Sequence, residues 1–376
     1  MTNGLKILHL LYESKGDPFG VGGVGMRAYA IYAHLRERHD ITLLCKKYPG
    51  AHDGEIDGLK HLYVGTESKN FTKTLLSYAY HASRFVRKYG HEFEIIIEEF
   101  SPAIPTFLGL FRKRPLVLQI QGYTGKHYFE KYNLFYSGIL YLFERFLPLF
   151  YKNIIVVSEA AGRRYHLESR DKNVTVLSNG VERECLLHEP EESNYILYLG
   201  RIDIHHKGLD LLLSACANLF SIFPHIRLLI AGDGRDAEQF LAMLKELPAS
   251  VRQNITMTGW VDGQRKMLLL RDALFVVVPS RYETQGIVAL EAMACGKAIV
   301  SSDIPELNYI PSNGAGIAFP SGDAGALASA MKDLILRSDR SLMGQKGREW
   351  VTELTWDRIA MRYENFLYAV YKNYRE

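Results

Sequence analysis

The stretch SRYETQGIVALEAMACGKAIVSSDIPEL, residues 280–307, follows an apolar run, Leu274–Pro279, that predicts a buried strand. A short loop then leads into a helix that is expected to open near Gly286. The first turn of such a helix has backbone N–H groups without intrahelical partners and the positive end of the helix dipole, so it suits an anion such as a phosphate. A buried strand, a glycine turn and a helix in this order are typical of an α/β fold.

Two glutamates, Glu283 and Glu291, stand eight residues apart on either side of Gly286. Carboxylates so far apart cannot easily ligate one phosphate-bound metal together, but each can accept hydrogen bonds from paired hydroxyls. A ligand with a diphosphate in the middle and a sugar at each end fits this spacing.

Basic residues follow a second predicted strand, Tyr195–Leu199. Gly200 allows a tight turn, Arg201 then projects from the carboxyl end of the strand, and Lys207 comes just before the next helix. An arginine and a lysine that converge there can bind a diphosphate, the arginine through two parallel hydrogen bonds and the lysine as a point charge. The alternative interpretation is that they are two solvated charges on a surface loop. It is less favoured when the two glutamates are considered together with them.

The composition is that of a soluble globular protein. The chain has 376 residues, enough for two ordinary domains, of which 47% are hydrophobic and 23% charged, and its net charge of +3 gives no case for nucleic acid as a partner. Its four cysteines show no C-x-x-C spacing and are interpreted as reduced thiols of a cytoplasmic protein. The N-terminus resembles a first strand more than a signal peptide. The longest apolar run, Leu134–Tyr151, is interrupted by charges and a proline, so no transmembrane segment is expected.

Short apolar runs alternate with helical patterns along the chain, which predicts parallel-sheet α/β architecture with a doubly wound sheet in each half. The polar stretch Glu182–Asn194 has five glutamates and a proline without periodicity and is interpreted as the linker. The predicted domains are residues 1–181 and 182–355, and a last helix, 356–376, is expected to pack back on the first domain. The predicted strands are Lys6–Leu11, Ile41–Cys45, Glu94–Ile97, Leu116–Ile120, Ile154–Val157, Val174–Leu177, Tyr195–Leu199, Arg227–Ala231, Ile255–Thr258, Leu274–Pro279, Ala298–Ser301 and Gly316–Ala318.

Residues 20–25, GVGGVG, satisfy the dinucleotide-binding pattern G-x-G-x-x-G, which is weak evidence by itself. A nicotinamide-binding loop should follow the first strand directly, but Glu13–Phe19 intervene here. The second strand should also end in an acidic residue for the ribose, whereas Ile41–Cys45 runs into two lysines. The sequence therefore argues against a nicotinamide cofactor.

The segment 280–307 resembles the donor-binding signature of the retaining nucleotide-sugar glycosyltransferases of family four, the group 1 glycosyl transferases with the GT-B fold. In that family a Glu, seven residues and a second Glu precede Ala-Met-Ala, a Gly and a Pro-Glu pair. The matching residues here are Glu283, Glu291, Ala292–Ala294, Gly296 and Pro305–Glu306. The Gly200-Arg201 and Lys207-Gly208 elements are similar to a second family motif, and shorter matches extend the resemblance over essentially the whole chain, strongly from Val174 onward.

The resemblance implies an α/β fold of two Rossmann-like domains facing across a cleft, and sugar transfer from a nucleotide-diphosphate sugar with retained anomeric configuration. Glu291 would hold the ribose hydroxyls and Glu283 the donor sugar's hydroxyls, while Arg201 and Lys207 would stabilise the leaving diphosphate without a metal or other cofactor. The catalytic candidates are therefore Arg201, Lys207 and Glu283. The remaining candidates for donor binding are Gly22, Gly23, Gln121, Gly234, Trp260, Val261, Thr284, Gln285, Gly286, Ile287 and Glu291.

Gln121 departs from the family pattern. The family usually has a histidine that touches the donor sugar after the strand predicted at Leu116–Ile120, and this chain has Gln121 there. A glutamine can hydrogen-bond a hydroxyl, but it cannot carry a proton charge near neutral pH. His127, six residues further on, is the alternative candidate for this contact, although a single loop histidine is more often a surface residue.

The stretch Tyr128–Tyr151 contains ten Tyr or Phe residues, with basic residues inside and beside it. They are interpreted either as core of the first domain or as a surface for anionic membrane headgroups. The implied acceptor is a glycan, a glycolipid or a lipid-linked intermediate of cell-envelope polysaccharide synthesis, and the protein would be cytoplasmic or peripheral on the inner face of the membrane. Two alternatives stay open, namely a nucleotide-sugar epimerase on the same fold and a catalytically silent nucleotide-sugar-binding protein.

Overall fold

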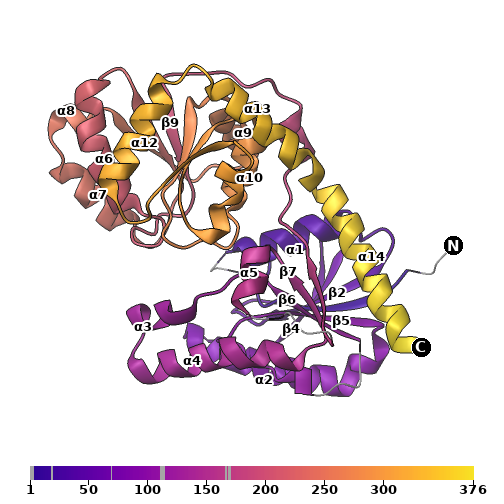
Figure 1. Cartoon of the computed structure of the whole chain (residues 1–376). Coiled ribbons are helices and arrows are strands. Elements are labelled where there is room, and N and C mark those ends of the chain that lie inside the picture. Colours follow the sequence, from indigo (N-terminus) through magenta and orange to yellow (C-terminus); the bar gives the residue numbers. More distant parts are fainter. Residues whose placement is uncertain (1–3, 18–19, 69, 111–114, 166, 168–170) are drawn as a thin grey trace. The chain divides into compact units, whose positions relative to one another are not determined.

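The computed structural model describes residues 4–17, 20–68, 70–110, 115–165, 167 and 171–376. The chain divides into two compact units, of which unit 1 comprises Met1–Asn179 and Trp356–Glu376 and unit 2 comprises Gly180–Thr355 (Figure 1). The last helix, α14 (Trp356–Arg375), therefore belongs to unit 1 although it follows unit 2 in the sequence.

Unit 1 is built on one sheet whose described strands lie in the order β3-β4-β2-β1-β5-β6-β7-β8. Neighbouring strands are parallel except β3, which runs antiparallel to β4. At the centre of the sheet, Ile7 of β1 lies opposite Ile41 of β2 and Ile95 of β5. The strands are β1 (Lys6–Leu10), β2 (Asp40–Lys46), β3 (Gly54–Ile56), β4 (Leu59–Val64), β5 (Ile95–Glu99), β6 (Leu116–Ile120), β7 (Asn153–Val156) and β8 (Asn173–Val176).

Helices cover both faces of this sheet. Leu8 and Leu10 pack with Tyr78 and other buried residues of α2. His9, between these two leucines in β1, points to the opposite face of the sheet. There its Nδ1 lies 2.7 Å from the hydroxyl of Tyr32 in α1. Strands covered on both faces must be apolar nearly throughout, which explains the continuous hydrophobic runs. The helices of unit 1 are α1 (Gly23–Ala33), α2 (Phe71–Tyr89), α3 (Tyr128–Lys131), α4 (Leu134–Phe146), α5 (Glu159–Arg164) and α14, with short 3-10 turns at η1 (Gly90–Glu92), η2 (Leu108–Leu110), η3 (Gly125–His127) and η4 (Leu147–Phe150).

Unit 2 has a second parallel sheet, in the order β11-β10-β9-β12-β13-β14. Its strands are β9 (Tyr195–Leu199), β10 (Arg227–Ala231), β11 (Ile255–Gly259), β12 (Phe275–Val278), β13 (Ile299–Ser302) and β14 (Gly316–Phe319). The main core of the unit joins strand residues such as Ile196 and Phe275 to buried residues of α6 and α12. The helices are α6 (Leu209–Ile222), α7 (Ala237–Glu246), α8 (Ala249–Arg252), α9 (Gly263–Asp272), α10 (Ile287–Ala294), α11 (Tyr309–Ser312), α12 (Ala324–Leu336) and α13 (Arg340–Val351), with 3-10 turns at η5 (Arg183–Leu186), η6 (Pro305–Leu307) and η7 (Thr352–Leu354).

The predicted α/β fold class, with a parallel sheet in each half, is confirmed. All twelve predicted strands are present, with ends that differ by at most two residues. The sequence analysis missed β3 and β4, which form a hairpin at the edge of the first sheet with Ile56 opposite Leu59. Asp57 and Gly58 make the turn, both with positive φ (53° and 74°), and an Asp-Gly pair between short strands is a strong hairpin signal.

The stretch interpreted as a linker, Glu182–Asn194, belongs to unit 2. It includes η5, whose Cys185 is buried. The guanidinium of Arg348 in α13 donates to the carbonyl of Leu186 at 2.6 Å, and Arg340 pairs with Glu192 at 3.0 Å. The burial of Cys185, the hydrogen bond from Arg348 and the Arg340–Glu192 ion pair help to fix a segment whose composition gives no periodic pattern.

Candidate active site

Two loops meet at the carboxyl ends of β9 and β12 in unit 2. Gly208 has a φ of 64°, and a Cβ built on it would lie 2.0 Å from the carbonyl oxygen of Pro279, so this close approach requires glycine. The backbone N–H of Arg281 donates to the carbonyl of His206 at 2.9 Å, and the Arg281 guanidinium binds both carboxylate oxygens of Asp210 at 2.8 and 2.7 Å. The loop that carries Lys207 is therefore fixed against the loop that carries Glu283.

Lys207 and Glu283, both predicted as catalytic, are brought together by this packing. The Lys207 ammonium forms a salt bridge with Oε1 of Glu283, and the hydroxyl of Ser280 donates to the same oxygen at 3.0 Å. Both side chains are largely but not fully buried. A mobile cation and a fixed carboxylate thus lie side by side, where an incoming diphosphate would compete with Glu283 for the ammonium.

Arg201, the third predicted catalytic residue, extends from the end of β9 and is 64% exposed. Its guanidinium lies 3.9 Å from Asp203, a carboxylate that also faces Arg235 at 3.4 Å and accepts the backbone N–H of His206 at 3.1 Å. Burial raises the pKa of Asp203, but the His206 amide and the surrounding positive charges outweigh it, so the pKa lies below the ordinary value. Asp203 therefore stays ionised and holds a cluster of cations at this edge of the sheet.

Glu291 lies on α10, one turn beyond the start of the helix. The helix begins after Gly286, whose φ of 72° puts it in the left-handed region that favours glycine. Glu291 is 6% exposed, and its Oε1 accepts from the Lys266 ammonium of α9 at 2.6 Å. Burial lowers the pKa of Lys266, but the neighbouring carboxylate more than compensates, so the pKa is raised. Sequence reasoning missed Lys266, because nothing in the pattern of α9 distinguishes it from a solvated lysine.

The loop before α10 carries four of the predicted donor-binding residues, Thr284, Gln285, Gly286 and Ile287. The Tyr309 hydroxyl donates to the carbonyl of Gln285 at 2.7 Å, and Tyr309 is partly buried. This contact anchors the loop at the N-terminus of α10. The first-turn amides of a helix are the ones that intrahelical carbonyls leave unsatisfied.

Glycines also close the ends of β9, β10 and β11. The N–H of Gly200 donates to Ala231 at 2.9 Å, and a Cβ on Gly234 would lie 2.3 Å from the carbonyl oxygen of Ile202. Gly234 is thus needed for backbone packing in this structure, whatever else it contacts. Of the two residues predicted after β11, Trp260 is exposed and Val261 is buried.

The predicted glycines of unit 1 lie in a loop that already binds an anion. Oε2 of Glu13 accepts the N–H of Gly22 at 2.9 Å and the N–H of Gly25 at 2.7 Å, at the N-terminus of α1. Burial raises the pKa of Glu13 in spite of these two hydrogen bonds. The sequence analysis gave Gly22 and Gly23 as candidates for donor binding, and in the structure the Glu13 carboxylate takes the amides of Gly22 and Gly25. Gly23 is the first residue of α1.

Gln121 follows β6 and lies beside the same loop. Its Nε2 donates to Glu99 at 3.2 and 3.1 Å and to the carbonyl of Val24 at 3.4 Å. His127, the alternative candidate, is partly buried in η3. The structure thus puts Gln121 in contact with Val24, in the first turn of α1 beside Gly22 and Gly23.

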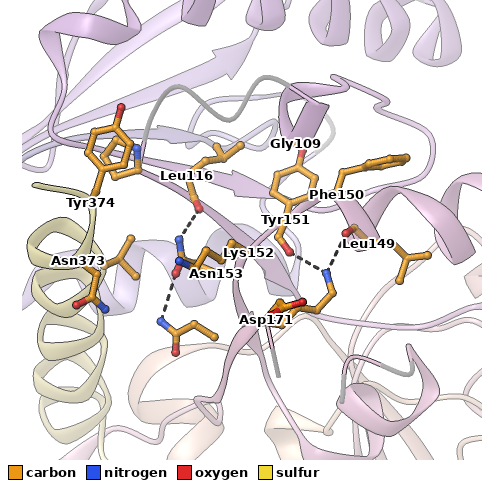
Figure 2. Close-up of a pocket in the computed structure, with 14 residues that line it drawn as sticks. Gly109, Leu116, Leu149, Phe150, Tyr151, Lys152, Asn153, Asp171, Asn373 and Tyr374 are labelled. Atoms are coloured by element: carbon orange, nitrogen blue, oxygen red, sulfur yellow. Dashed lines mark hydrogen bonds between the residues drawn. The ribbon is translucent and has the colours of Figure 1, made fainter. Parts of the chain in front are cut away.

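Within the described residues, no group of three or more His, Cys, Asp or Glu side chains could hold a metal ion. A cavity of about 810 Å³ in unit 1 lies at the amino ends of β6, β7 and β8 (Figure 2). The carboxyl-terminal turn of α14 lines it with Asn373 and Tyr374, and Lys172 donates to the carbonyls of Leu149 and Tyr151 there. None of the predicted site residues lines this cavity, which is at the opposite edge of the sheet from Gln121.

Two family models match the chain, one described as glycosyl transferases group 1 over residues 187–350 and one as glycosyltransferase family 4 over residues 21–184. A phosphatidyl-myo-inositol mannosyltransferase from Mycobacterium leprae is 33% identical over 216 residues, which are 55% of this chain and 56% of that protein. The chain spans about half the length of the curated relatives it matches.

Solved structures share the fold. A sucrose-phosphate synthase from Thermosynechococcus elongatus has a TM-score of 0.78 at 19% identity, covering 98% of this chain and 100% of that one. Anabaena Alr3699/HepE, solved in complex with UDP-glucose, has a TM-score of 0.73 at 16% identity, covering 97% and 100%. With one family model matched in each half and a parallel sheet in each unit, the chain belongs to the group 1 glycosyltransferases, which have the GT-B fold.

Proposed function

We propose that this protein is a retaining glycosyltransferase that moves a hexose-type sugar from a nucleotide-diphosphate sugar to a hydroxyl of a glycan or lipid-linked acceptor, without a metal. The observation that carries the proposal is the salt bridge between Lys207 and Glu283 at the carboxyl ends of β9 and β12, immediately before the N-terminus of α10. A sugar diphosphate needs a cation and helix N-terminal amides for its phosphates and a hydrogen-bond acceptor for its sugar hydroxyls. Lys207, the start of α10 and the Glu283 carboxylate could supply these groups.

In the proposed reaction, negative charge builds on the diphosphate as the bond to the sugar breaks. Arg201, Lys207 and the amides at the start of α10 would stabilise that charge, which is the main catalytic requirement of such a step. Glu283 would accept hydrogen bonds from the sugar's hydroxyls once Lys207 turns to the phosphates. Glu291 would hold the ribose hydroxyls, with one of its oxygens already committed to Lys266.

We propose no protein nucleophile for this reaction. The leaving diphosphate would guide the proton of the acceptor hydroxyl on the same face of the sugar, so the anomeric configuration is retained. In unit 1, Gln121, Gly22 and Gly23 are the proposed contacts for substrate, and Glu13 would have to release the Gly22 amide before a ligand could take it.

A lipid acceptor is favoured by the name of the mannosyltransferase relative, which denotes a phosphatidyl-inositol substrate for that protein. We also propose that unit 1 binds an anionic membrane surface through α4, where Leu134 and Phe135 are 78% and 80% exposed. Exposed basic residues on α2 of the same unit, among them Arg84 and Lys88, suit anionic headgroups. No helix within the described residues is long and apolar enough to cross a membrane.

The proposal is tested by replacing Arg201 and Lys207, the two cations proposed to bind the diphosphate. Arg201→Ala and Lys207→Ala should each slow sugar transfer by roughly 100-fold, about 3 kcal/mol of transition-state stabilisation, and weaken nucleotide-diphosphate binding. Binding of the nucleoside alone should not change. Lys332→Ala, which removes an exposed lysine of α12, is the matched control.

The substrates for this test come from a screen of UDP, GDP and ADP sugars by thermal shift, because a bound ligand raises apparent stability. Product analysis with and without an added hydroxyl acceptor then identifies the reaction. If calorimetry finds nucleotide-diphosphate binding unchanged in both variants, Arg201 and Lys207 do not bind the diphosphate. Isomerised nucleotide sugar without transfer would favour an epimerase, and binding without any turnover would favour a silent binding protein.

A further inference from the structure

The segment that enters unit 2 lies against the C-terminal end of helix α10. Its 3-10 turn η5 is in contact with α10. Further along, the carbonyl of Glu191 accepts a hydrogen bond from the buried ammonium of Lys297, and a Cβ built on Gly296 would lie 3.2 Å from Cγ of Pro190. The turn that follows α10 is therefore held against this segment from two sides.

The same packing brings together two cysteines that are far apart in the sequence. Cys185 of η5 and Cys295, the C-cap of α10, are 5% and 1% exposed, and their thiols are hydrogen-bonded to each other. The hydrogen bond from Cys295 lowers the pKa of Cys185. That hydrogen bond, together with burial, raises the pKa of Cys295. Cys185 is thus the thiol that ionises more readily, and a second thiol lies beside it.

Cys45 and Cys216 provide a comparison within the same chain. Both are fully buried, and burial raises the pKa of each thiol. Cys45 donates to the carbonyl of Glu13 at 3.7 Å, and Cys216 packs among the apolar residues of the unit 2 core. Thiols buried in this way are unreactive, because the thiolate is the reactive form.

Cys185 is covered only by a short and largely exposed segment. η5 is four residues long, Arg183 and Glu184 within it are exposed, and Leu187 directly after it is 71% exposed. Segments with few buried contacts open locally at a small cost in free energy. Opening of η5 is therefore expected to expose Cys185 to a small reagent, while Cys295 stays at the end of a buried helix.

We propose that Cys185 and Cys295 form a thiol–disulfide exchange site, at which a small disulfide such as oxidised glutathione converts the two thiols into one intramolecular disulfide. The Cys185 thiolate attacks a sulfur of the small disulfide, which leaves a mixed disulfide on Cys185 and releases one small thiolate. The Cys295 sulfur then attacks the Cys185 sulfur and releases the second small thiolate. Each small thiolate takes up the proton that one cysteine gives up.

In total, two protein thiols and one small disulfide give one protein disulfide and two small thiols, so two electrons pass from the protein to the reagent. The new bond would join η5 to the end of α10. A cross-link between distant parts of a chain restricts its unfolded state, so the bond should stabilise unit 2. The inference does not depend on the proposed function, because the exchange needs neither a sugar donor nor an acceptor.

The test treats the folded, reduced protein with oxidised glutathione, removes the reagent, and then blocks the remaining thiols with a maleimide in denaturant. Mass spectrometry should find two blocked cysteines, Cys45 and Cys216, and a linked pair of peptides that contain Cys185 and Cys295. All four cysteines should be blocked when a reductant is added first. Scanning calorimetry should show the transition of unit 2 raised by about 5–10 °C after oxidation and restored by reduction.

Single substitutions separate the roles of the two thiols. Cys295→Ser removes the second attack, so glutathione should stay attached to Cys185 as a mixed disulfide. Cys185→Ser removes the first attack, and Cys295 should then react at least about tenfold more slowly than Cys185 does in the parent protein. Cys216→Ala is the matched control, because it removes a buried thiol of the same unit and should be oxidised as the parent is.

The parent protein alone decides whether the disulfide forms, so a variant that fails to fold leaves the test valid. Blocking of all four thiols after oxidation would overturn the proposal. So would a mixed disulfide that persists on Cys185 in the parent, since Cys295 would then be unable to reach it. Attachment of glutathione to Cys45 and Cys216 as fast as to Cys185 would show that the contact between the two thiols confers no reactivity.

Discussion

At the scale of single residues, both predicted carboxylates of unit 2 are paired with lysines that serve them differently. Lys207 is in a loop, partly exposed, and can leave Glu283 for a phosphate. Lys266 is on a helix, and its ammonium lies 2.6 Å from a carboxylate that is almost fully buried. A substrate phosphate could replace Glu283 as the partner of Lys207. The Lys266–Glu291 pair is expected to stay intact when nucleotide binds and to orient Glu291.

Lys266→Met tests this difference. Removing one partner of a buried pair leaves an uncompensated charge, so the free energy of unfolding should fall by about 3 kcal/mol. Binding of every nucleotide with a free ribose should weaken by roughly tenfold as Glu291 loses its orientation. Lys266→Arg, which keeps the charge, should bind nearly as the parent does. Calorimetry with a nucleoside, its diphosphate and the sugar nucleotide checks this, and tighter binding in Lys266→Met would mean that Lys266 competes with the ribose.

Some of these contacts could be predicted from the sequence and others could not. Gly200 and Gly208 locate the loop of Lys207, and Gly286 locates the start of α10, because each has a positive φ. No feature of the sequence predicted that the Glu13 carboxylate would lie in the glycine loop. Its position depends on how far the chain runs beyond β1 before it turns back, which the residue types in between do not specify.

At the scale of whole elements, the parallel strands were predictable, including the edge strands β8, β11 and β14, whereas β3 and its neighbour β4 were not. A central parallel strand is covered on both faces and must be apolar, so its run is visible in the sequence. β4 is nearer the edge, and exposed Lys60 interrupts its pattern. Helix α4 inverts the usual pattern, because it buries Glu144 and exposes Phe135.

The inversion in α4 has a local cause. The Glu144 carboxylate accepts the backbone N–H groups of Thr124 and Gly125 at 2.8 and 2.6 Å and the hydroxyl of Tyr128 at 3.1 Å. These bonds hold the loop before α3, so the helix turns its polar residue inward. Of the two interpretations of the aromatic stretch, core packing applies to Tyr128 and Tyr151, which are buried, and not to the exposed Phe135.

The membrane proposal predicts that α4 carries the contact. Phe135→Ser and Leu134→Ser should each reduce sedimentation with anionic vesicles by roughly tenfold, because each removes apolar area worth about 1.5–3 kcal/mol when buried. Binding should also weaken with added salt, since screening shortens the reach of the basic residues. Leu336→Ser is the matched control, a leucine of unit 2 that is 64% exposed. Absence of binding to anionic vesicles at low salt, or equal loss in the control, would contradict the proposal.

At the scale of the whole molecule, the chain forms unit 1 from two separate segments. It passes into unit 2 after Asn179 and returns after Thr355. The two passages are bridged, because Val181 pairs in parallel with Thr355 and its N–H donates to the carbonyl of Leu354 at 2.8 Å. The sequence analysis put the first boundary after Val181 and the second after residue 355. That α14 would pack on unit 1 could be expected only from its aromatic content, since the composition of a helix does not identify its partner.

Deleting residues 356–376 should therefore unfold unit 1 and leave unit 2 folded. α14 buries six apolar side chains, Trp356, Ile359, Ala360, Tyr363, Leu367 and Val370, and ties itself to the first segment through hydrogen bonds from His39 to Glu364 at 2.8 Å and from Tyr371 to Glu94 at 2.6 Å. At about 1.5–3 kcal/mol for each large side chain, the loss equals or exceeds the typical stability of a domain, about 5–15 kcal/mol.

Scanning calorimetry should show that one transition disappears, and nucleotide-diphosphate binding by unit 2 should persist. Deletion of only Arg375 and Glu376, which are exposed, is the control. Loss of both transitions on deleting α14 would mean that unit 2 depends on a folded unit 1 for its own stability.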